Sequence, residues 1–320
     1  MRFVQHVVSG SRRLSVVVDD LAADVAGILE QRVLVADGYR GERAARLAAH
    51  LAPTELADFL ALGEAAMDRA RAVAECVAAD RDSTAATGYL TPLADLTYAS
   101  PCSPTSALYC AGLNYRDHVA EQAGRAVSEY PSIFLRIADS VVGHRQPLVR
   151  PSGVSVDLDF EGELAVVIGR PCHRVAAADA LSHVAGYTVF NDGSVRDFQK
   201  RGPELFPGKN FFHTGAMGPW LVTADEVGDP QDIDLTTTLA GEIMQSSNTR
   251  YMIFDVATLI ATVSDFSYLQ PGDVIATGTP AGVGFRRTPP RFLVPGERIT
   301  VTFDRVGTLE NDIIDETDRR

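Results

Sequence analysis

Hydrophobic and polar residues alternate in two different ways along this chain, and the change comes near residue 100. From residue 107 onward, short apolar runs are separated by Gly, Pro and Asp, which is typical of strands joined by tight turns. Many short strands with few helices indicate a β-rich α+β domain over residues 101–320, not a doubly wound parallel sheet. The pattern predicts strands at 107–111, 132–136, 157–168, 186–190, 219–223, 234–240, 273–277 and 298–303, and helices at 114–123, 176–184 and 255–266.

Residues 1–100 have a different pattern. A short apolar run at 14–18 predicts one strand, and alanine-rich stretches at 20–31 and 42–76 have helical spacing. Few side chains in this part suggest chemistry. We therefore expect a smaller N-terminal α/β cap domain, joined to the second domain by a linker at 100–106, SPCSPTS.

Composition and charge narrow the classes of partner. The chain is 46% hydrophobic with a net charge of −13, which argues against nucleic acid and anionic lipid as partners. No apolar stretch is long enough to span a bilayer, and the N-terminus has no signal-peptide pattern, so we expect no membrane association. The four cysteines form no CxxC pair, and we expect reduced thiols in a cytoplasmic protein.

The acidic residues of the run SVDLDFEGELAVVIG stand at every second position: Asp157, Asp159, Glu161 and Glu163. On a strand all four carboxylates leave from one face, where they repel one another unless something positive lies above them. A hard divalent cation such as Mg²⁺ or Ca²⁺ takes oxygen ligands of this kind. The alternative is a solvated edge strand with a charged outer face.

Lysine is rare in this chain. Of the 29 basic residues only Lys200 and Lys209 are lysines. Lysine offers a compact ammonium that fits a tight pocket, which arginine does not. Lys209 lies between a turn and an aromatic run in PGKNFF, where a specific role is favoured, whereas Lys200 beside Arg201 is consistent with chance.

The segment GLNYRDHVAEQ places His118 and Glu121 three residues apart, so one helical turn brings them to the same face. A carboxylate that accepts a hydrogen bond from imidazole fixes its tautomer and supports it as a general base. A surface His–Glu pair is the alternative.

A second candidate segment is YTVFNDGSVRDFQKRG. Asp192 follows an apolar strand and is a possible third metal ligand beside Glu161 and Glu163, although NDG is also an ordinary turn signal. Arg196 and Gln199 follow at helical spacing, and the guanidinium can bind a carboxylate with two hydrogen bonds.

In VIATGTPAGVG an apolar strand leads into a glycine-rich loop with Thr277 and Thr279. Backbone N–H groups and a hydroxyl in such a loop can hold an anionic oxygen. A plain tight turn explains the same pattern, and the spacing is not that of a dinucleotide-binding loop.

Taken in order, these segments resemble the fumarylacetoacetate hydrolase family over roughly residues 105–315. The resemblance rests on GLNYRDHVAE, DFEGELAVVIG, GYTVFNDGSVRDFQ, PGKNF, GPWLVT, MIFDVATLI and LQPGDVIATGTPAGVG. It implies a mixed β-sandwich roll for the catalytic domain, usually in a homodimer. It also implies an enzyme acting on small anionic 2-oxo acids, such as those formed in aromatic catabolism.

The resemblance assigns roles residue by residue. It implies that Mg²⁺ (or Mn²⁺ or Ca²⁺) is bound by Glu161, Glu163 and Asp192; that His118 and Glu121 are a catalytic dyad on a mobile lid turn and Lys209 a catalytic lysine; and that Arg196, Gln199 and Thr279 contact the substrate. One departure is Arg136, which stands where many members have lysine.

These roles imply hydrolysis of a C–C bond in an acylpyruvate or related 2,4-dioxo acid through an enolate held on the metal. His118 then activates a water and Lys209 stabilises the developing oxyanion. The same residues suit decarboxylation of oxaloacetate-like acids, or isomerisation or hydration of a hydroxydienoic dicarboxylic acid. A non-catalytic metal-dependent binding module also keeps the carboxylates, but it has little reason to keep His118 with Glu121.

Overall fold

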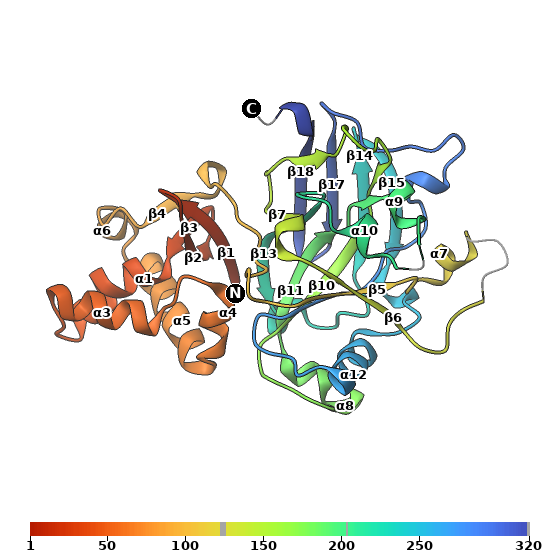
Figure 1. Ribbon diagram of the computed structural model, residues 1–320. Helices are drawn as coiled ribbons and strands as arrows, with labels where there is room; N and C mark the ends of the chain where they lie inside the picture. Colours follow the sequence, from red (N-terminus) through yellow and green to blue (C-terminus); the bar gives the residue numbers. More distant parts are fainter. Residues whose placement is uncertain (122–125, 203, 319–320) are drawn as a thin grey trace.

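The computed structural model describes residues 1–121, 126–202 and 204–318 (Figure 1). Its centre is an 11-stranded mixed sheet, in which β10 is made of an uninterrupted apolar run and is buried on both faces. A strand of this composition is typical of the interior of a sheet that is covered on both sides. In spatial order the sheet contains β4 (Leu90–Pro92), β3 (Leu21–Asp24), β2 (Ser11–Val18), β1 (Arg2–Val8), β13 (Gly215–Thr223), β11 (Val184–Asn191), β10 (Gly162–Ile168), β16 (Val274–Ala276), β5 (Leu108–Gly112) and β6 (Ser132–Arg136), with β7 (Val141–Val142) paired to β13.

A second sheet of five strands packs against this one. Its strands β14 and β17 bury every second residue, as expected when one face meets a core and the other meets solvent. A single apolar cluster joins residues of β10, β11 and β13 to residues of β14, β17 and β18. The order is β15 (Glu242–Asn248), β14 (Asp234–Leu239), β17 (Arg298–Phe303), β18 (Gly307–Asp315) and β8 (Leu148–Arg150), and a separate small pair is β12 (Ser194–Val195) with β9 (Leu158–Asp159).

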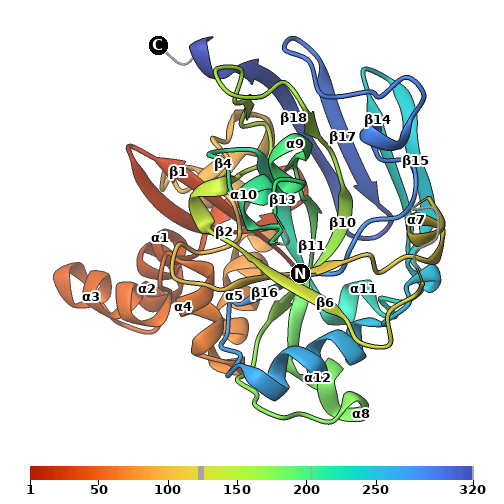
Figure 2. The same ribbon diagram turned by 45° about the vertical axis from the view of Figure 1, so that its right-hand side comes forward.

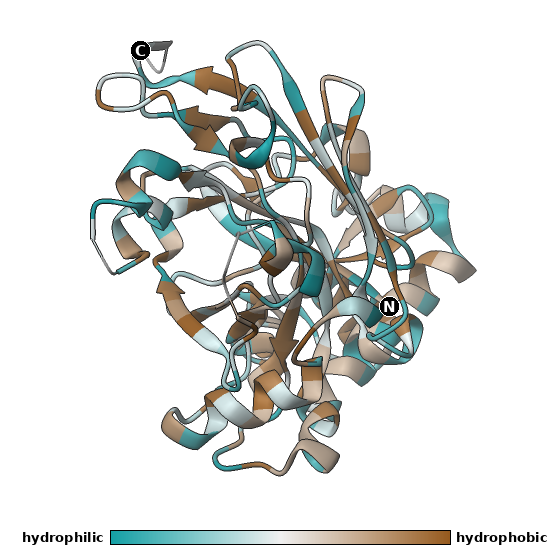
Figure 3. Cartoon of the chain, turned by 90° about the vertical axis from the view of Figure 1, so that its right-hand side faces the viewer, coloured by the Kyte–Doolittle hydropathy of each residue, from teal (hydrophilic) through white to brown (hydrophobic). Residues whose placement is uncertain are grey.

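The two packed sheets confirm the predicted α+β class and the mixed β-sandwich roll. Figures 1 and 2 show β14, β15, β17 and β18 beside the central strands, with α8 and α12 next to each other at one end. In Figure 3 the hydrophobic colour follows the interior strands, whereas the connecting loops are mostly hydrophilic. The helices of this part are short: α7 (Arg116–Ala120), α8 (Ala177–Ala180), α9 (Arg196–Gln199), α10 (Phe206–Lys209), α11 (Ala224–Val227) and α12 (Val256–Phe266).

The N-terminal part forms a lobe in which helices cover strands β1–β4 (Figure 1). Strand β1 also pairs with β13, so the lobe shares the large sheet with the rest of the chain. The division of the chain near residue 100 therefore stays a prediction. The helices of the lobe are α1 (Val25–Ile28), α2 (Leu34–Ala36), α3 (Gly41–Leu51), α4 (Leu56–Ala61), α5 (Glu64–Ala79) and α6 (Arg81–Ala85). Within the described residues no helix has the length and apolarity needed to cross a membrane.

Several element boundaries differ from the sequence-based expectations. The strand expected at 157–168 is two strands, β9 and β10, with a break at residues 160–161. The helix expected at 114–123 is the short α7 in the described part, and 122–123 lie outside the described residues. At 176–184, α8 ends early and is followed by a 3₁₀ turn.

The helix expected at 20–31 is wrong in its first half. Residues 21–24 form β3, which is held between β2 and β4, because pairing on both sides outweighs the helical preference of alanine. The helix begins only after Asp24, whose side chain accepts a hydrogen bond from the Gly27 amide and caps it. Strands β1, β8, β15 and β18 were not expected from the sequence.

Candidate active site

Three buried carboxylates meet at the break between β9 and β10. Glu161 precedes β10, Glu163 lies in it, and Asp192 follows the adjacent strand β11. Gly162 pairs with Asn191, and the Asp192 amide donates to the Glu161 carbonyl at 2.9 Å, so the strand register brings these residues side by side. One carboxylate oxygen from each of the three lies within 4.8 Å of the others.

The predicted stripe of four carboxylates on one strand face is wrong because the strand breaks. Asp159 turns away from the group and accepts hydrogen bonds from the amides of Gly284 and Phe285. Asp157 is partly exposed and lies outside the group. Asp192, from the neighbouring strand, takes the third place instead.

Positive side chains lie against these carboxylates. The Lys209 ammonium is 2.6 Å from both Glu161 and Asp192, and Arg196 lies 2.7 Å from Glu161 and 2.8 Å from Asp159. Burial lowers the pKa of Lys209, but Asp192 and Glu161 outweigh burial and raise it, so the lysine stays protonated. Burial likewise raises the pKa of Glu161, but Lys209 and Arg196 lower it to about 2.

Glu163 is the exception among the three carboxylates. Among the described residues it has no ion pair, and it accepts a hydrogen bond from the Gly278 amide at 2.9 Å. Burial, followed by the charges of Asp192 and Glu161, raises the pKa of Glu163 well above its ordinary value. An all-oxygen donor set with one uncompensated buried carboxylate fits a hard divalent cation, which would restore the charge balance of Glu163.

The predicted dyad is formed. His118 Nδ1 lies 2.9 Å from Glu121 Oε2, and Glu121 Oε1 accepts a hydrogen bond from the Gly282 amide at 2.9 Å. Burial raises the pKa of Glu121, but the hydrogen bonds from His118 and Gly282 outweigh it and lower the pKa. With Nδ1–H donating to Glu121, the other ring nitrogen, Nε2, is left to exchange protons.

The glycine-rich loop that follows β16 organises the site through its backbone. Its amides at Gly278, Gly282 and Gly284 donate to Glu163, Glu121 and Asp159 respectively. Gly282 has φ +102°, and an added Cβ would lie 2.2 Å from the Met244 carbonyl oxygen, so no other residue fits there. The expectation that this loop holds an anionic oxygen is therefore met by carboxylates of the protein itself.

A cavity of about 240 Å³ opens above these groups. Asp192 and Glu121 do not line the cavity themselves. Asp192 is hydrogen-bonded to the lining residue Lys209, and Glu121 to the lining residue His118. The other seven predicted site residues line the cavity: His118, Glu161, Glu163, Arg196, Gln199, Lys209 and Thr279.

The three side chains that the resemblance assigns to substrate contact, Arg196, Gln199 and Thr279, have hydrogen-bond partners within the protein. Arg196 donates to Gln199 at 2.9 Å, while its Nη2 has no hydrogen-bond partner among the described residues. Thr279 donates its hydroxyl to the Gly162 carbonyl and accepts from Gln245. Lys200 also lines the cavity, so the interpretation of this lysine as a chance remainder finds no support in its position.

Arg136 is the residue whose importance sequence reasoning missed. Its buried guanidinium contacts Asp192 at 2.5 Å, and it also donates to the Gly193 carbonyl, to Ser140 and to Thr214. The one signal in the sequence was the departure from lysine at this position. Arginine adds donors that tie β6 to the turn carrying Asp192.

Comparison with known proteins agrees with this geometry. The family model described as fumarylacetoacetate (FAA) hydrolase C-terminal matches residues 107–314. The chain belongs to the fumarylacetoacetate hydrolase family. The residues matched are close to the range over which the sequence motifs indicated the resemblance.

Relatives of this family member have several named activities. Oxaloacetate tautomerase YisK of Bacillus subtilis (strain 168) is 39% identical over 82% of this chain and 87% of its own. The mitochondrial oxaloacetate tautomerase FAHD2A of Homo sapiens is 39% identical over 82% of this chain and 80% of its own. A maleylpyruvate hydrolase from Sphingobium sp. SYK-6, solved with manganese(II) and pyruvate, superposes with a TM-score of 0.69 at 28% identity, covering 98% and 99% of the two chains.

Proposed function

We propose that this protein is a divalent-metal-dependent enzyme that interconverts the keto and enol forms of oxaloacetate or a closely related 2-oxo dicarboxylic acid. The observation that carries the proposal is the His118–Glu121 dyad lining the same small cavity as Glu161 and Glu163. A proton donor and acceptor opposite a hard-cation site is the arrangement that enolisation needs. Relatives at 39% identity that are named oxaloacetate tautomerases support this choice of substrate.

Glu161, Glu163 and Asp192 would hold the ion, which when bound supplies Lewis-acid polarisation of the 2-oxo acid. His118 Nε2 takes a proton from the carbon next to the carbonyl, and the proton passes to the former carbonyl oxygen to give the enol; the reverse transfers give the keto form. Glu121 fixes the imidazole with Nε2 as the reacting atom and stabilises the imidazolium that forms. The Gly282 amide holds Glu121 in this orientation.

The substrate's anionic groups meet cationic side chains. Arg196 lines the cavity, and its buried Nη2 has no hydrogen-bond partner among the described residues, so this nitrogen can donate to a substrate carboxylate. Gln199, hydrogen-bonded to Arg196, offers its amide nitrogen in the same place. Lys209 stabilises negative charge on the enolate oxygen, and Thr279 shapes the adjoining wall.

The charge balance of the site suits an anionic substrate. When all four buried carboxylates (Asp159, Glu161, Glu163 and Asp192) are ionised, they face three buried cations (Arg136, Arg196 and Lys209), which leaves one negative charge. A divalent ion changes this to one positive charge, and the site then attracts a 2-oxo acid.

The experiment is a set of assays with Mg²⁺ and Mn²⁺, each with a chelator control. Loss of enol absorbance measures oxaloacetate tautomerisation, and pyruvate release measures decarboxylation and acylpyruvate hydrolysis. We expect oxaloacetate tautomerisation to have the highest kcat/KM. If fumarylpyruvate or acetylpyruvate is cleaved with a higher kcat/KM than oxaloacetate is tautomerised, the proposal is wrong.

Hydrolysis of an acylpyruvate is the second candidate, favoured by the structural likeness to a maleylpyruvate hydrolase. In that reaction His118 would deprotonate a water, and the water would attack the distal carbonyl. We rank it second because the relatives at 39% identity are named oxaloacetate tautomerases, whereas the maleylpyruvate hydrolase is 28% identical. Decarboxylation of oxaloacetate and isomerisation or hydration of a hydroxydienoic dicarboxylic acid use the same groups.

We further propose a homodimer in the cytoplasm. Leu135, Ile137, Phe206 and Phe212 are exposed apolar residues, and the Asn210 side chain links their segments by hydrogen bonds to residues 135, 137 and 206. Such a group of apolar side chains suits the interface between two copies of the chain. Light scattering would give twice the chain mass of 34.4 kDa for a dimer and that mass for a monomer.

A further inference from the structure

Two cations that have no ion pair with any described residue flank the mouth of the cavity. Lys200, next to the end of α9, and Arg286, in the loop after β16, both line the cavity and are both exposed. In the described part of the chain neither side chain has an ion pair or a side-chain hydrogen bond. The chain has 42 acidic residues against 29 basic ones, yet no described carboxylate pairs with either of these two cations.

The neighbouring Arg201 shows the ordinary behaviour of a surface cation in this protein. Its guanidinium pairs with Asp197 at 3.2 Å and stacks over Phe198 at 3.4 Å from the ring centroid. Arg201 does not line the cavity. Arg201 and Lys200 are adjacent in the sequence but differ in their surroundings. The charge of Arg201 is neutralised by Asp197, whereas Lys200, beside the cavity, has no ion pair among the described residues.

Phe285 connects the mouth to the floor of the cavity. Lys200 lies 4.9 Å and Arg286 4.5 Å from the centroid of its ring, and Arg196 from the floor lies 4.2 Å from the same centroid. The Phe285 amide also donates to Asp159 at 3.1 Å, which anchors this residue to the buried charge network. The ring attracts all three cations, but it does not cancel their charges.

We propose that Lys200 and Arg286 form a subsite for the second carboxylate of a dicarboxylic 2-oxo acid. The first carboxylate and the oxo group would lie at the floor, beside Arg196 and the ion that Glu161, Glu163 and Asp192 would hold, and the distal carboxylate would point to the mouth. A carboxylate there relieves the repulsion between the two unpaired cations. The subsite rests on the proposed function, and it makes these two residues the determinants of dicarboxylate over monocarboxylate specificity.

The test compares two stable acids that differ by one carboxylate. Isothermal titration calorimetry of the Mg²⁺-saturated protein, at constant ionic strength, gives the dissociation constants of 2-oxoglutarate and 2-oxobutyrate. Their ratio measures how much the distal carboxylate adds to the affinity. We expect Lys200→Gln and Arg286→Gln each to weaken 2-oxoglutarate binding about 3- to 10-fold, and to change 2-oxobutyrate binding less than about twofold. The double variant should bind the two acids almost equally, and Arg201→Gln should behave as wild type.

The ratio of the two affinities is the decisive readout, because Arg286 also lies near Glu121 and influences the dyad electrostatically. Equal weakening of both acids would mean general attraction of anions and would overturn the subsite, as would a wild-type protein that does not prefer 2-oxoglutarate or binds neither acid. If the protein binds 2-oxoglutarate more tightly than 2-oxobutyrate but does not convert oxaloacetate, the proposed function alone is overturned. If it converts oxaloacetate but binds the two acids equally, the subsite alone is overturned.

Discussion

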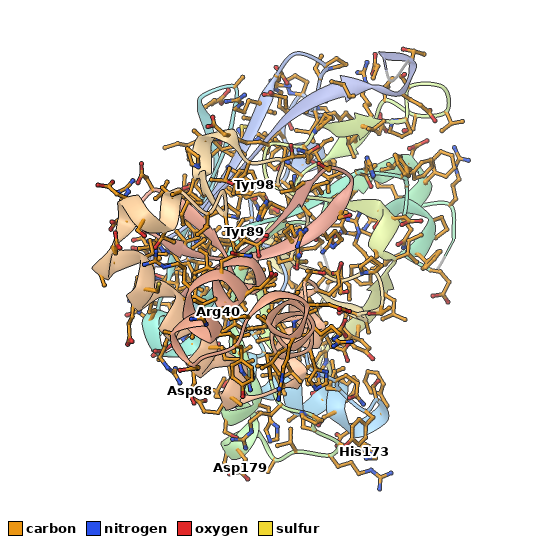
Figure 4. The ribbon with its side chains drawn as sticks, turned by 90° about the vertical axis from the view of Figure 1, so that its left-hand side faces the viewer. Arg40, Asp68, Tyr89, Tyr98, His173 and Asp179 are labelled. Atoms are coloured by element: carbon orange, nitrogen blue, oxygen red, sulfur yellow. The ribbon has the colours of Figure 1, made fainter. Side chains whose placement is uncertain are left out.

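Charged side chains gather in two regions of this molecule with opposite surroundings. At the floor of the cavity, Glu161, Asp192 and Lys209 are almost fully buried. On α5 of the N-terminal lobe, Arg71 pairs with Glu64 and Asp68, and these side chains are 45% to 77% exposed. Figure 4 looks onto the lobe and labels Asp68 on its outer surface.

The difference in burial separates charged residues that serve a site from those that only cover the surface. The pairs on α5 are screened by water and contribute little to stability, as exposed ion pairs generally do. Burying ions at the floor requires removing their hydration, which attraction between partners offsets only partly. A cluster as buried as Glu161, Asp192 and Lys209 is therefore better explained by binding and chemistry than by folding.

Among substitutions at the floor of the cavity, Glu163→Gln should reduce activity and Mg²⁺ binding the most. The amide keeps the shape and still accepts from the Gly278 amide, but it removes the charge that a divalent cation needs. We expect activity to fall at least about 1000-fold, and the thermal stabilisation by Mg²⁺ to disappear. Turnover and the melting temperature with and without Mg²⁺ measure the two effects.

The matched control for this variant is Glu64→Gln on α5. It removes the same charge from an exposed position, so both the activity and the response to Mg²⁺ should remain. Without Mg²⁺, Glu163→Gln should melt no lower than wild type, because an uncompensated buried carboxylate is lost. Retained stabilisation by Mg²⁺ would show that Glu163 is not a ligand.

His118→Ala tests the other wall of the cavity. We expect kcat to fall about 100- to 10,000-fold, because the proton donor and acceptor is removed. The affinity for Mn²⁺ should change less than about twofold, since His118 is not in the group of three carboxylates. Steady-state kinetics and titration with Mn²⁺ measure both, and full activity of the variant would exclude the proton-transfer role.

Much of the geometry of this candidate site was predictable because its motifs are local. His118 and Glu121 are three residues apart, and Arg196 and Gln199 likewise share one helical turn. Long-range pairing was not predictable: Arg136 reaches Asp192 across 56 positions, and nothing in the local pattern indicates this contact. The four-carboxylate stripe was wrong for a related reason, because the strand break that turns Asp159 away depends on amides from a loop 125 positions later.

The same long-range dependence explains the errors in the fold. Residues 21–24 look helical by composition, but pairing with β2 and β4 makes them a strand. Strand β18 carries polar residues throughout, GTLENDIID, and its identity comes from its neighbours β17 and β8. The interior strand β10 was clear from the sequence because burial on both faces leaves a continuous apolar run.

Arg136→Ala against Arg71→Ala compares the two regions directly. Removing Arg136 leaves Asp192 with one fewer buried partner, and we expect a loss of about 3–5 kcal/mol in the free energy of unfolding. Removing Arg71 should leave the midpoint of urea denaturation unchanged, because its pairs are exposed. Arg136→Lys should fall between wild type and Arg136→Ala, since it keeps the charge and loses most of the hydrogen bonds.

A similar loss of stability for Arg136→Ala and Arg71→Ala would contradict the comparison. Urea denaturation by circular dichroism, without added metal, measures all three variants. Adding Mg²⁺ to wild type and to Arg136→Lys would then show how far Arg136 also prepares Asp192 for the ion.

His144 extends the comparison to a buried group that has no partner of opposite charge among the described residues. Its ring and that of Tyr98 are nearly perpendicular, with centroids 4.6 Å apart, and its Nδ1 accepts from the Glu310 amide at 3.1 Å. Burial, followed by Arg145 and Arg298, lowers its pKa from 6.5 to about 4. Above pH 6.5 the imidazole is neutral in both states; as the pH falls towards 4, the unfolded chain takes up the proton first, so stability is lost across this window.

We therefore expect His144 to reduce the free energy of unfolding by about 1 kcal/mol between pH 7 and pH 5.5. In His144→Asn the side-chain oxygen can still accept from the Glu310 amide, and the variant should lose less stability over the same range. His50→Asn, on the exposed surface of α3, is the matched control and should follow wild type. Urea denaturation at several pH values measures the slopes, and parallel curves for wild type and His144→Asn would mean that the buried imidazole does not contribute to the acid sensitivity of the fold.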